Sequence, residues 1–477
     1  MNSHKTDGKE NQEKVAVIGA GIRGLCTAWE LTKNGYSTII LEKQKFPGGL
    51  AGSIEHNNYQ MDLGPHFFRL LRNSPISRDI KSLMGDKDLK EIQFSYKVYF
   101  HGHTLDVSYP EIYDIVFKFG GKFFLKSLFG LLSSKIKYYF KKDFLNAEEY
   151  LIKTYGKYLY YIWFKPYITE RYGEPKNQTK DFIISHFPSF SFLTIFSYVL
   201  KKRLSKKIQN PKITKKNDEE NVNWYFTYGM GHFIKKIIEY IENNNGKVHL
   251  NTEITSIDHE NKIISFSNEK LKDKIKVDKI IYSTPPPISI KWFDNIPNYI
   301  KSTKPKGNRL NSIMVFLGIN SSKLFDGWIM NVYDPNISFF RISQQSYLSD
   351  KVCPQGKSLL CLEIKVRDEQ GLWNSDDEEI IVRIKNDLQK MKILTTQSID
   401  DFKIIRMKGT YPILGEKDED YSKILEFINS HNNEYIMSTV GSRIKNSGDI
   451  KPTSGGLNGA LVNTRAIVQK IMNESKN

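Results

Sequence analysis

Residues 14–42, KVAVIGAGIRGLCTAWELTKNGYSTIILE, decide the fold. The apolar run at 15–18 predicts a buried parallel strand, and Gly19, Gly21 and Gly24 follow it in GxGxxG spacing. In such a turn the first glycine permits the bend, the second lets a pyrophosphate approach the backbone, and the third lets helix and strand pack closely. The segment therefore predicts a strand–turn–helix unit that presents the helix N-terminus to a phosphate.

A second strand and an acidic residue follow at the right distance. The run STIIL leads to Glu42, about 20 residues after the glycines, where a carboxylate can accept hydrogen bonds from a ribose. No arginine stands beside Glu42, which favours an adenosine that lacks a 2′-phosphate. Strand, glycines, helix, second strand and acid agree in order and spacing, so we interpret them as a dinucleotide site.

Two more motifs go beyond a simple nicotinamide site. Residues 46–53 read FPGGLAGS, a loop rich in backbone N–H groups, and residues 62–68 read DLGPHFF. In this order, the motifs resemble those of the FAD-dependent amine oxidase and protoporphyrinogen oxidase superfamily, which includes phytoene-desaturase-like enzymes and UDP-galactopyranose mutases. Many amine oxidases have Arg at the position of Leu50, so the chain is more similar to the desaturase and mutase branches.

The resemblance implies an α/β fold, with a Rossmann-like FAD-binding domain of the GR2-type flavoproteins and a discontinuous α+β substrate domain. We expect a disordered tail at 1–13. The FAD-binding domain would comprise 14–99, 222–287 and 406–477, and the substrate domain 100–221 and 288–405. Residues 285–287 are three prolines, which cannot continue a central strand and so mark a boundary.

The resemblance also assigns the FAD contacts. Residues 229–254 would form a glycine turn, an amphipathic helix and a strand whose backbone contacts the adenine at Ile254. Near the C-terminus, Ser442 stands where many relatives have an acid that binds the ribityl chain, which leaves the detailed contacts there open. The expected cofactor-binding residues are Gly19, Gly21, Ile22, Gly24, Glu42, Lys43, Gly49, Leu50, Ala51, Gly64, Pro65, His66, Ile254, Gly441, Ser442, Gly456, Leu457 and Ala460.

Two classes of chemistry fit the resemblance. In the first, a substrate C–H gives hydride to the flavin N5, and His66 lies beside the ring; alternatively, His66 only fixes its own turn. In the second, reduced flavin attacks the anomeric carbon of a nucleotide sugar, and Arg341 and Tyr411 match mutase residues. Arg341 could equally form a structural salt bridge.

The sequence favours the oxidoreductase over the mutase. The mutase stretch R-x-P-x-R corresponds to HFPSF at 186–190, in which both arginines are absent. A flavin fold without catalysis remains a third alternative. The substrate, which could be lipophilic or a nucleotide sugar, is left open, as are the electron acceptor and the oligomeric state.

The overall composition limits the kinds of binding partner and the cellular compartment that we expect. The 477 residues carry a formal charge of +17, yet no helix-turn-helix, zinc-finger or RNA-binding pattern accompanies it, so we expect no nucleic acid. The cysteines, at 26, 353 and 361, form no CxxC pair and no metal-ligand set, which indicates a reducing compartment and no metal. With neither an apolar signal segment nor a membrane-spanning run, we expect a cytoplasmic protein.

Peripheral membrane contact is a further open alternative. Residues 111–144 interleave aromatics and leucines with lysines, and residues 201–216 are strongly basic. An apolar face with a lysine rim can lie in a bilayer interface. The other interpretation is that these helices pack on the substrate domain and carry solvated lysines.

Overall fold

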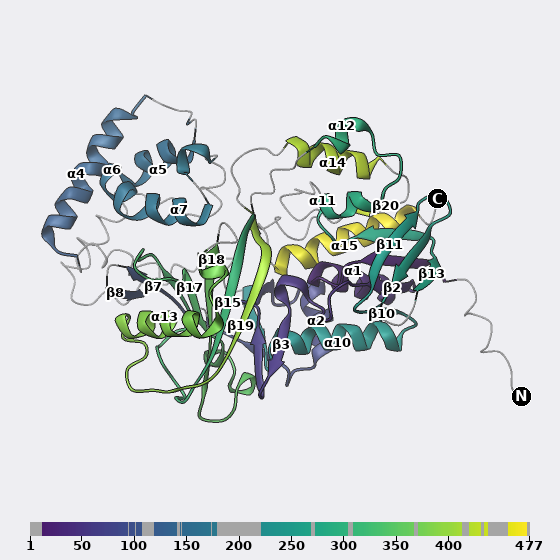
Figure 1. Ribbon diagram of the computed structural model, residues 1–477, viewed down its shortest axis with the longest axis horizontal. Helices are drawn as coiled ribbons and strands as arrows, with labels where there is room; N and C mark the ends of the chain where they lie inside the picture. Colours follow the sequence, from purple (N-terminus) through teal and green to yellow (C-terminus); the bar gives the residue numbers. More distant parts are fainter. Residues whose placement is uncertain are drawn as a thin grey trace, which may run out of the picture. The chain divides into compact units, whose positions relative to one another are not determined.

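The computed structural model describes residues 12–93, 95–100, 102–106, 119–140, 144, 146–172, 174–178, 221–268, 272–303, 309–366, 371–412, 419–430, 434–436 and 457–474. The chain divides into two compact units (Figure 1). Unit 1 comprises 1–92, 220–306 and 418–477, and unit 2 comprises 93–219 and 307–417. Each unit is therefore built from separated pieces of the chain.

The division differs from the sequence-based boundaries by two residues at the return to unit 1, which is at 220 and not at 222, and by more at three other places. Strand β7 (Tyr96–Phe100) pairs with β16 (Ile329–Val332), so the chain enters unit 2 before residue 100. Residues 288–306 stay in unit 1, because Phe293 and Ile300 are buried in its core. Strand β19 (Ile399–Pro412) keeps residues beyond 405 in unit 2. Residues 1–11 of the expected tail lie outside the described residues, and Glu13 forms an ion pair with Lys279 at 2.9 Å.

Unit 1 is organised around a five-stranded parallel sheet in the order β10-β2-β1-β14-β20. Its strands are β1 (Lys14–Ile18), β2 (Ser37–Leu41), β10 (Lys247–His249), β14 (Lys279–Tyr282) and β20 (Glu434–Ile436). Its longer helices are α1 (Ile22–Lys33), α2 (Pro75–Met84), α10 (Met230–Asn243), α14 (Glu419–Asn429) and α15 (Leu457–Glu474). Strand β1 is the central strand, with β2 and β10 on one side of it and β14 and β20 on the other, as in nucleotide-binding Rossmann folds.

Smaller elements complete unit 1. A hairpin, two three-stranded sheets and four short helices surround the main sheet. They are β3 (Ser53–His56), β4 (Tyr59–Asp62), β5 (Phe68–Leu71), β6 (Leu89–Glu91), β9 (Asn221–Phe226), β11 (Glu253–Asp258), β12 (Ile263–Ser267), β13 (Lys272–Lys276), η1 (Gly49–Ala51), α11 (Pro286–Ser289), η5 (Ile290–Trp292) and α12 (Asn298–Lys301).

Alternate residues of the parallel strands are buried on opposite faces of the sheet. Val15 and Val17 belong to a core that also contains buried residues of α1, α10 and α15, whereas Ala16 and Ile18 belong to a second core with β11, β12 and α14. Strands covered on both sides read as continuous apolar runs, which is how 15–18 appear in the sequence.

Unit 2 contains a seven-stranded sheet in the order β19-β15-β18-β17-β16-β7-β8. All neighbours are antiparallel except β16 and β7. The other strands are β8 (His103–Asp106), β15 (Arg309–Ile319), β17 (Arg341–Gln344) and β18 (Ser358–Val366). Helix α13 (Asp377–Lys390) contributes Ile380, Ile384 and Leu388 to the core on this sheet.

A helical part of unit 2 has its own small core of Ala147, Leu151, Tyr160, Phe164 and Ile168. Its helices are α4 (Gly121–Lys137), α5 (Ala147–Tyr155), α6 (Lys157–Leu159), the π-helical turn η3 (Tyr160–Phe164), α7 (Lys165–Tyr172) and η4 (Pro175–Asn177). Three further short turns of unit 2 are η6 (Gln345–Tyr347), η7 (Asp350–Val352) and η8 (Gly371–Trp373).

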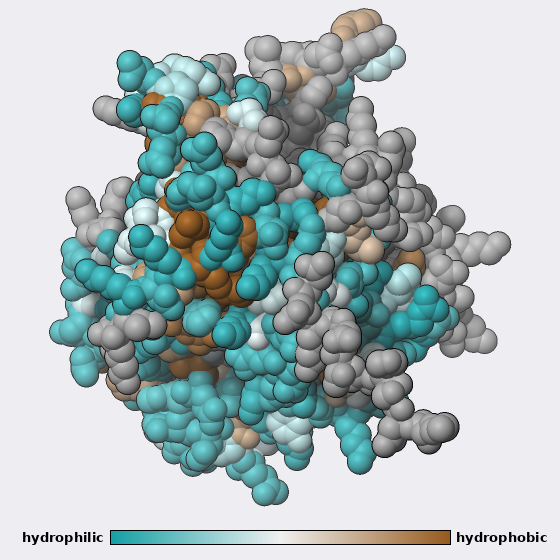
Figure 2. Space-filling view, turned by 90° about the vertical axis from the view of Figure 1, so that its right-hand side faces the viewer, coloured by the Kyte–Doolittle hydropathy of each residue, from teal (hydrophilic) through white to brown (hydrophobic). Residues whose placement is uncertain are grey.

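The surface is predominantly polar on the face that Figure 2 shows, where hydrophilic side chains surround a smaller hydrophobic area. The three cysteines are buried, and none of them forms a disulfide bond. In the part of the chain that the structure describes, no helix is long and apolar enough to cross a bilayer, and no cluster of three or more His, Cys, Asp or Glu could hold a metal ion.

The glycine turn gives a matched test of the packing. A Cβ at Gly24 would lie 2.1 Å from the carbonyl oxygen of Gly19, whereas a Cβ at Gly21 has no described atom within 4 Å. We expect Gly24→Ala to lower the free energy of unfolding by about 3 kcal/mol, because helix and strand must separate. Gly21→Ala should leave it nearly unchanged. Urea unfolding measures both; equal midpoints for the two variants would contradict the assigned contact.

Candidate functional site

The first part of the site is the turn between β1 and α1, at the carboxyl edge of the parallel sheet. The Gly19 amide donates to the carbonyl of Leu41 at 2.9 Å, which fixes the turn against the end of β2. Helix α1 then starts without a side-chain cap and without an acidic residue in its first turn. Its N-terminus therefore keeps the partial positive charge that attracts a phosphate.

The glycine-rich loop at 48–52 lies against this turn. The Gly48 amide donates to the carbonyl of Ala20 at 2.7 Å, and Gly48 and Gly21 form a parallel bridge. Gly48 has φ +101°, and a Cβ there would lie 2.5 Å from the side chain of Ile234. Nothing in the described protein requires a glycine at position 21, because a Cβ there has open space around it. A pyrophosphate approaching the backbone supplies such a requirement, so the turn fits a dinucleotide.

Glu42 lies directly after β2, next to the glycine turn. Its Oε2 accepts a hydrogen bond from the Ala20 amide at 2.7 Å, and its Oε1 accepts one from the Gln44 amide at 2.8 Å. These bonds fix the carboxylate while each oxygen retains further acceptor capacity. The structure thus brings Glu42 to the glycine turn, and its contact with a ribose stays a prediction.

His66 connects two loops of the site. Its Nε2 donates to the carbonyl of Leu50 at 3.0 Å and also lies 3.2 Å from the carbonyl of Leu63. Because both partners are acceptors, Nε2 carries the proton. The imidazole therefore holds the 48–52 loop against the Gly64 turn, which is the structural role that the sequence left open. The Leu50 side chain beside it is exposed.

Asp62 is a residue of the site that the sequence prediction missed. It is buried at the end of β4 and accepts hydrogen bonds from Ser53 Oγ, Tyr225 OH at 2.8 Å and the Met230 amide at 2.9 Å. Gly229, with φ +79°, lets the carboxylate approach, since a Cβ there would lie 2.9 Å from Oδ1. Asp62 thereby joins β4 to β9 and to the start of α10. The sequence feature that could have identified Asp62 is its place at the start of the DLGPH motif at 62–66.

Ser283 is a second residue near the glycine turn that the sequence analysis did not identify. It follows β14 at the carboxyl edge of the sheet, and its Oγ would lie 3.1 Å from a Cβ at Gly24. This hydroxyl is buried without a hydrogen-bond partner among the described residues. A buried, unbonded hydroxyl beside the turn is a polar group available to a ligand or a water molecule.

The remaining predicted cofactor residues have varied positions. Lys43 forms an exposed ion pair with Glu253 at 2.7 Å. Ile254 lies in β11, where its side chain is buried and its carbonyl accepts from Trp292 Nε1 at 3.3 Å. Leu457 and Ala460 are buried in the first turn of α15. Gly441, Ser442 and Gly456 lie outside the described residues, as does the stretch 186–190.

Arg341 belongs to unit 2, at the start of β17. Its Nε and Nη2 donate to the two carboxylate oxygens of Glu363, the second at 2.6 Å, and Glu363 is buried. This bidentate pair satisfies a buried charge, which is the structural role considered for Arg341. Tyr411 lies in β19, and its side chain is not among those described. The diphosphate role of Arg341 and the mutase-like role of Tyr411 stay predictions.

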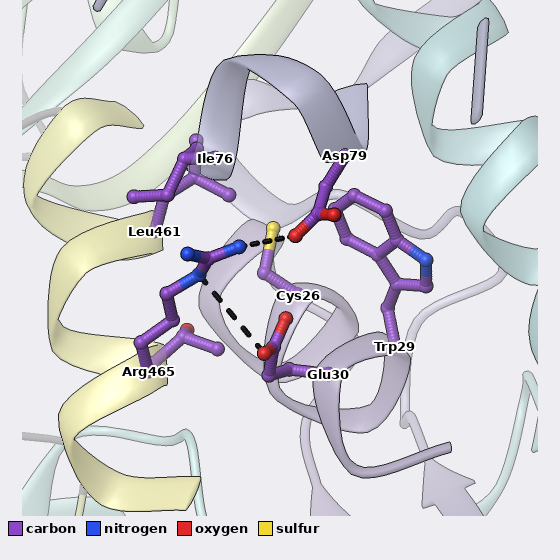
Figure 3. A pocket seen from close by; sticks show the side chains of 8 residues that line it. Cys26, Trp29, Glu30, Ile76, Asp79, Leu461 and Arg465 are labelled. Atoms are coloured by element: carbon purple, nitrogen blue, oxygen red, sulfur yellow. Dashed lines mark hydrogen bonds and ion pairs between the residues drawn. The ribbon is translucent and has the colours of Figure 1, made fainter. Parts of the chain in front are cut away.

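A small cavity lies on another side of α1, among α1, α2 and α15 (Figure 3). Arg465 lies between Asp79 and Glu30, and Cys26 and Trp29 line the space. Its volume is about 10 Å³, enough for about one water molecule. Burial raises the pKa of the Cys26 thiol, so it stays protonated. This cavity is part of the helix packing and has no room for a cofactor.

Comparisons with known proteins agree with this geometry. A family model of NAD(P)-binding Rossmann-like domains matches residues 17–83. The chain is 43% identical over 58 residues to a 1-hydroxycarotenoid 3,4-desaturase of Flavobacterium sp. (strain P99-3), and 28% identical over 92 residues to a 4,4′-diapophytoene desaturase of Staphylococcus aureus (strain MRSA252). These matches span 12% and 18%, respectively, both of this chain and of the desaturase.

Solved structures match over nearly the whole chain. A reduced UDP-galactopyranose mutase superposes with a TM-score of 0.73 at 16% identity, covering 97% of this chain and 94% of that one. A putative protoporphyrinogen oxidase from Exiguobacterium sp. 255-15 superposes with a TM-score of 0.67 at 14% identity, covering 97% and 99%. The chain therefore has the fold of these two structures, and residues 17–83 match a Rossmann-like nucleotide-binding domain. The desaturase matches of the N-terminal segment agree with the resemblance described above, and over the whole chain the likeness to the solved structures is one of fold.

The buried Asp62 gives a pH prediction. Burial raises the pKa of Asp62 above its ordinary value of 3.8, although the hydrogen bonds from Ser53 and Tyr225 oppose the shift. As the pH rises above 3.8, the unfolded chain loses this proton before the folded protein does, so the carboxyl lowers stability until it ionises in the fold. We expect the stability of wild type minus that of Asp62→Asn to fall by about 1.4 kcal/mol per pH unit in that window.

Asp258 provides the control with the opposite sign. Hydrogen bonds from Asn261 lower the pKa of this exposed carboxyl, so its contribution is present above pH 3.8 and is lost below it. Urea unfolding of Asp258→Asn should therefore show a lower stability than wild type above pH 3.8, and the difference should shrink as the pH falls below that value. A flat difference for Asp62→Asn above pH 3.8 would refute the shift assigned to Asp62.

Proposed function

We propose that the chain is an FAD-dependent oxidoreductase that oxidises a C–H-bearing substrate. The observation that carries the proposal is the open space at Gly21, between an uncapped helix N-terminus and the 48–52 loop. In a dinucleotide turn this position lies against the pyrophosphate. The second loop, the desaturase relatives of the N-terminal segment and the fold shared with the putative protoporphyrinogen oxidase support a flavin in place of a nicotinamide.

The residues of unit 1 have distinct roles in this proposal. Glu42, held by two backbone amides, accepts hydrogen bonds from the adenosine ribose. The first turn of α1 and the glycine loop donate amides to the diphosphate. FAD, when bound, supplies the acceptor for the hydride. His66 orients the 48–52 loop through the Leu50 carbonyl and is thus a positioning residue.

The alternative is a mutase-like reaction on a nucleotide sugar. Such a reaction needs cationic groups for a diphosphate, preferably arginine forks. Arg341 is the candidate that the sequence offered, and it directs two of its N–H groups to the buried Glu363. Separating the two would leave an uncompensated buried carboxylate, at a cost of about 3–5 kcal/mol. We therefore place the oxidoreductase first.

Cofactor binding is tested with Gly21→Val. The branched side chain fills the space that we assign to the pyrophosphate, while φ −62° and ψ 163° at this residue suit valine. We expect wild type to retain FAD through gel filtration and Gly21→Val to lose it while keeping its unfolding midpoint. Gly121→Val is the matched control, since position 121 also has open space but lies in unit 2. A Gly21→Val protein that remains fully yellow would refute the site.

The reaction class is tested by anaerobic mixing of the flavin-loaded protein with a porphyrinogen, a polyene or an amine. We expect one of these classes to bleach the visible flavin absorption, because hydride transfer reduces the ring. The same mixture with UDP-galactopyranose, before and after dithionite reduction, is the control. Turnover of the sugar nucleotide only after reduction, with no bleaching by any C–H donor, would make the mutase the correct assignment.

A further inference from the structure

Helix α4 in unit 2 presents large apolar side chains to solvent along one line. Leu125, Phe129, Leu132 and Ile136 follow a spacing of four, three and four residues, which places them on one face of a helix. Each of them is between 52% and 77% exposed. Tyr139 and Phe140, just beyond the helix, are 75% and 91% exposed. We call these six residues the α4 apolar surface.

The opposite face of α4 is the one that packs. Ser127, Leu131 and Ser134 are buried there. A Cβ at Gly156 would lie 2.6 Å from the Leu131 amide nitrogen, so α4 approaches the start of α6 at backbone distance. Figure 1 shows α5 and α6 beside α4. The packed face thus contains two serines beside Leu131, whereas four large apolar side chains face solvent, which is the reverse of the distribution on an ordinary surface helix in water.

Lysines flank the exposed apolar face. Lys122, Lys126 and Lys137 lie on one side of it and Lys135 on the other, as the helical period places them. Residues 115–142 contain no Asp or Glu. An apolar stripe flanked by lysines, with no acidic residue in the segment, matches a membrane surface that is apolar inside and negatively charged outside.

We propose that the α4 apolar surface inserts into the headgroup region of an anionic lipid bilayer, with the flanking lysines on the lipid phosphates. This binding requires no helix that spans the membrane. A second copy of the chain is a poorer occupant, because two α4 faces would bring lysines against lysines on proteins that each carry a formal charge of +17. The proposal does not depend on which reaction the chain catalyses.

Vesicle flotation of the full chain tests the proposal. We expect the protein to float with vesicles of phosphatidylcholine and phosphatidylglycerol, and to float much less with phosphatidylcholine alone or in high salt, where the lysine contribution is screened. Failure to float with the anionic vesicles would overturn the proposal.

Matched variants locate the contact. Phe129→Ser with Ile136→Ser should lower partitioning at least about tenfold, because two exposed apolar groups no longer insert. Val382→Ser, at a residue of α13 that is 60% exposed, should bind as wild type does. Lys122→Gln and Lys135→Gln should each lower partitioning about fivefold, and Lys385→Gln on α13 should not. Wild-type flotation of the Phe129/Ile136 variant would refute the assigned surface.

Two further measurements distinguish insertion into a bilayer from association with a second copy of the chain. Phe129→Trp should be quenched by brominated lipid in anionic vesicles, which checks insertion without removing an apolar group; an unquenched tryptophan would contradict it. Sedimentation without lipid examines self-association. A wild-type dimer that dissociates in the Phe129/Ile136 variant would assign this surface to a second copy and overturn the membrane proposal.

Discussion

The approach of α1 to β1 at the glycine turn is the contact on which unit 1 depends. The Gly24 backbone lies so close to the Gly19 carbonyl that a single added carbon would overlap it. This closeness places the helix N-terminus at the sheet edge, where the Leu41 carbonyl, Glu42 and the 48–52 loop converge. One steric constraint therefore sets both the helix packing and the shape of the nucleotide site.

Around that turn, hydrogen bonds to backbone groups hold the loops. Glu42 binds the Ala20 amide, His66 binds the Leu50 carbonyl, and Asp62 binds the Met230 amide. Each side chain thereby connects segments that are separated in sequence. Because the loops are already held in place, they lose little conformational freedom when a ligand binds. A site organised in this way is formed before any ligand binds.

The sequence was informative where chemistry depends on local spacing. The GxGxxG turn, the acid after β2 and the apolar face of α10 all follow from periodicity over short segments, and the structure places each as predicted. Asp62 was missed because its partners, Tyr225 and Met230, are about 160 residues away and no spacing rule connects them. The Arg341–Glu363 pair required knowledge that β17 and β18 are neighbours.

The domain boundaries show the same limit. Proline runs and family likeness located the crossovers approximately, but strand pairing decides which unit a residue joins. Strand β7 belongs to unit 2 because of β16, more than 200 residues later, and nothing in residues 93–100 alone reveals that partner.

That pairing has a consequence for biosynthesis. On a ribosome, β7 and β8 emerge long before β16, and the central strand β1 emerges before β14 and β20, so both sheets wait for partners from the distal part of the chain. Until then β7 has an unpaired edge, which is a template for association with other chains. Contacts of such long range slow folding. A nascent chain of this architecture is therefore expected to rely on chaperones during translation, and neither unit can be produced by cutting the gene at one place.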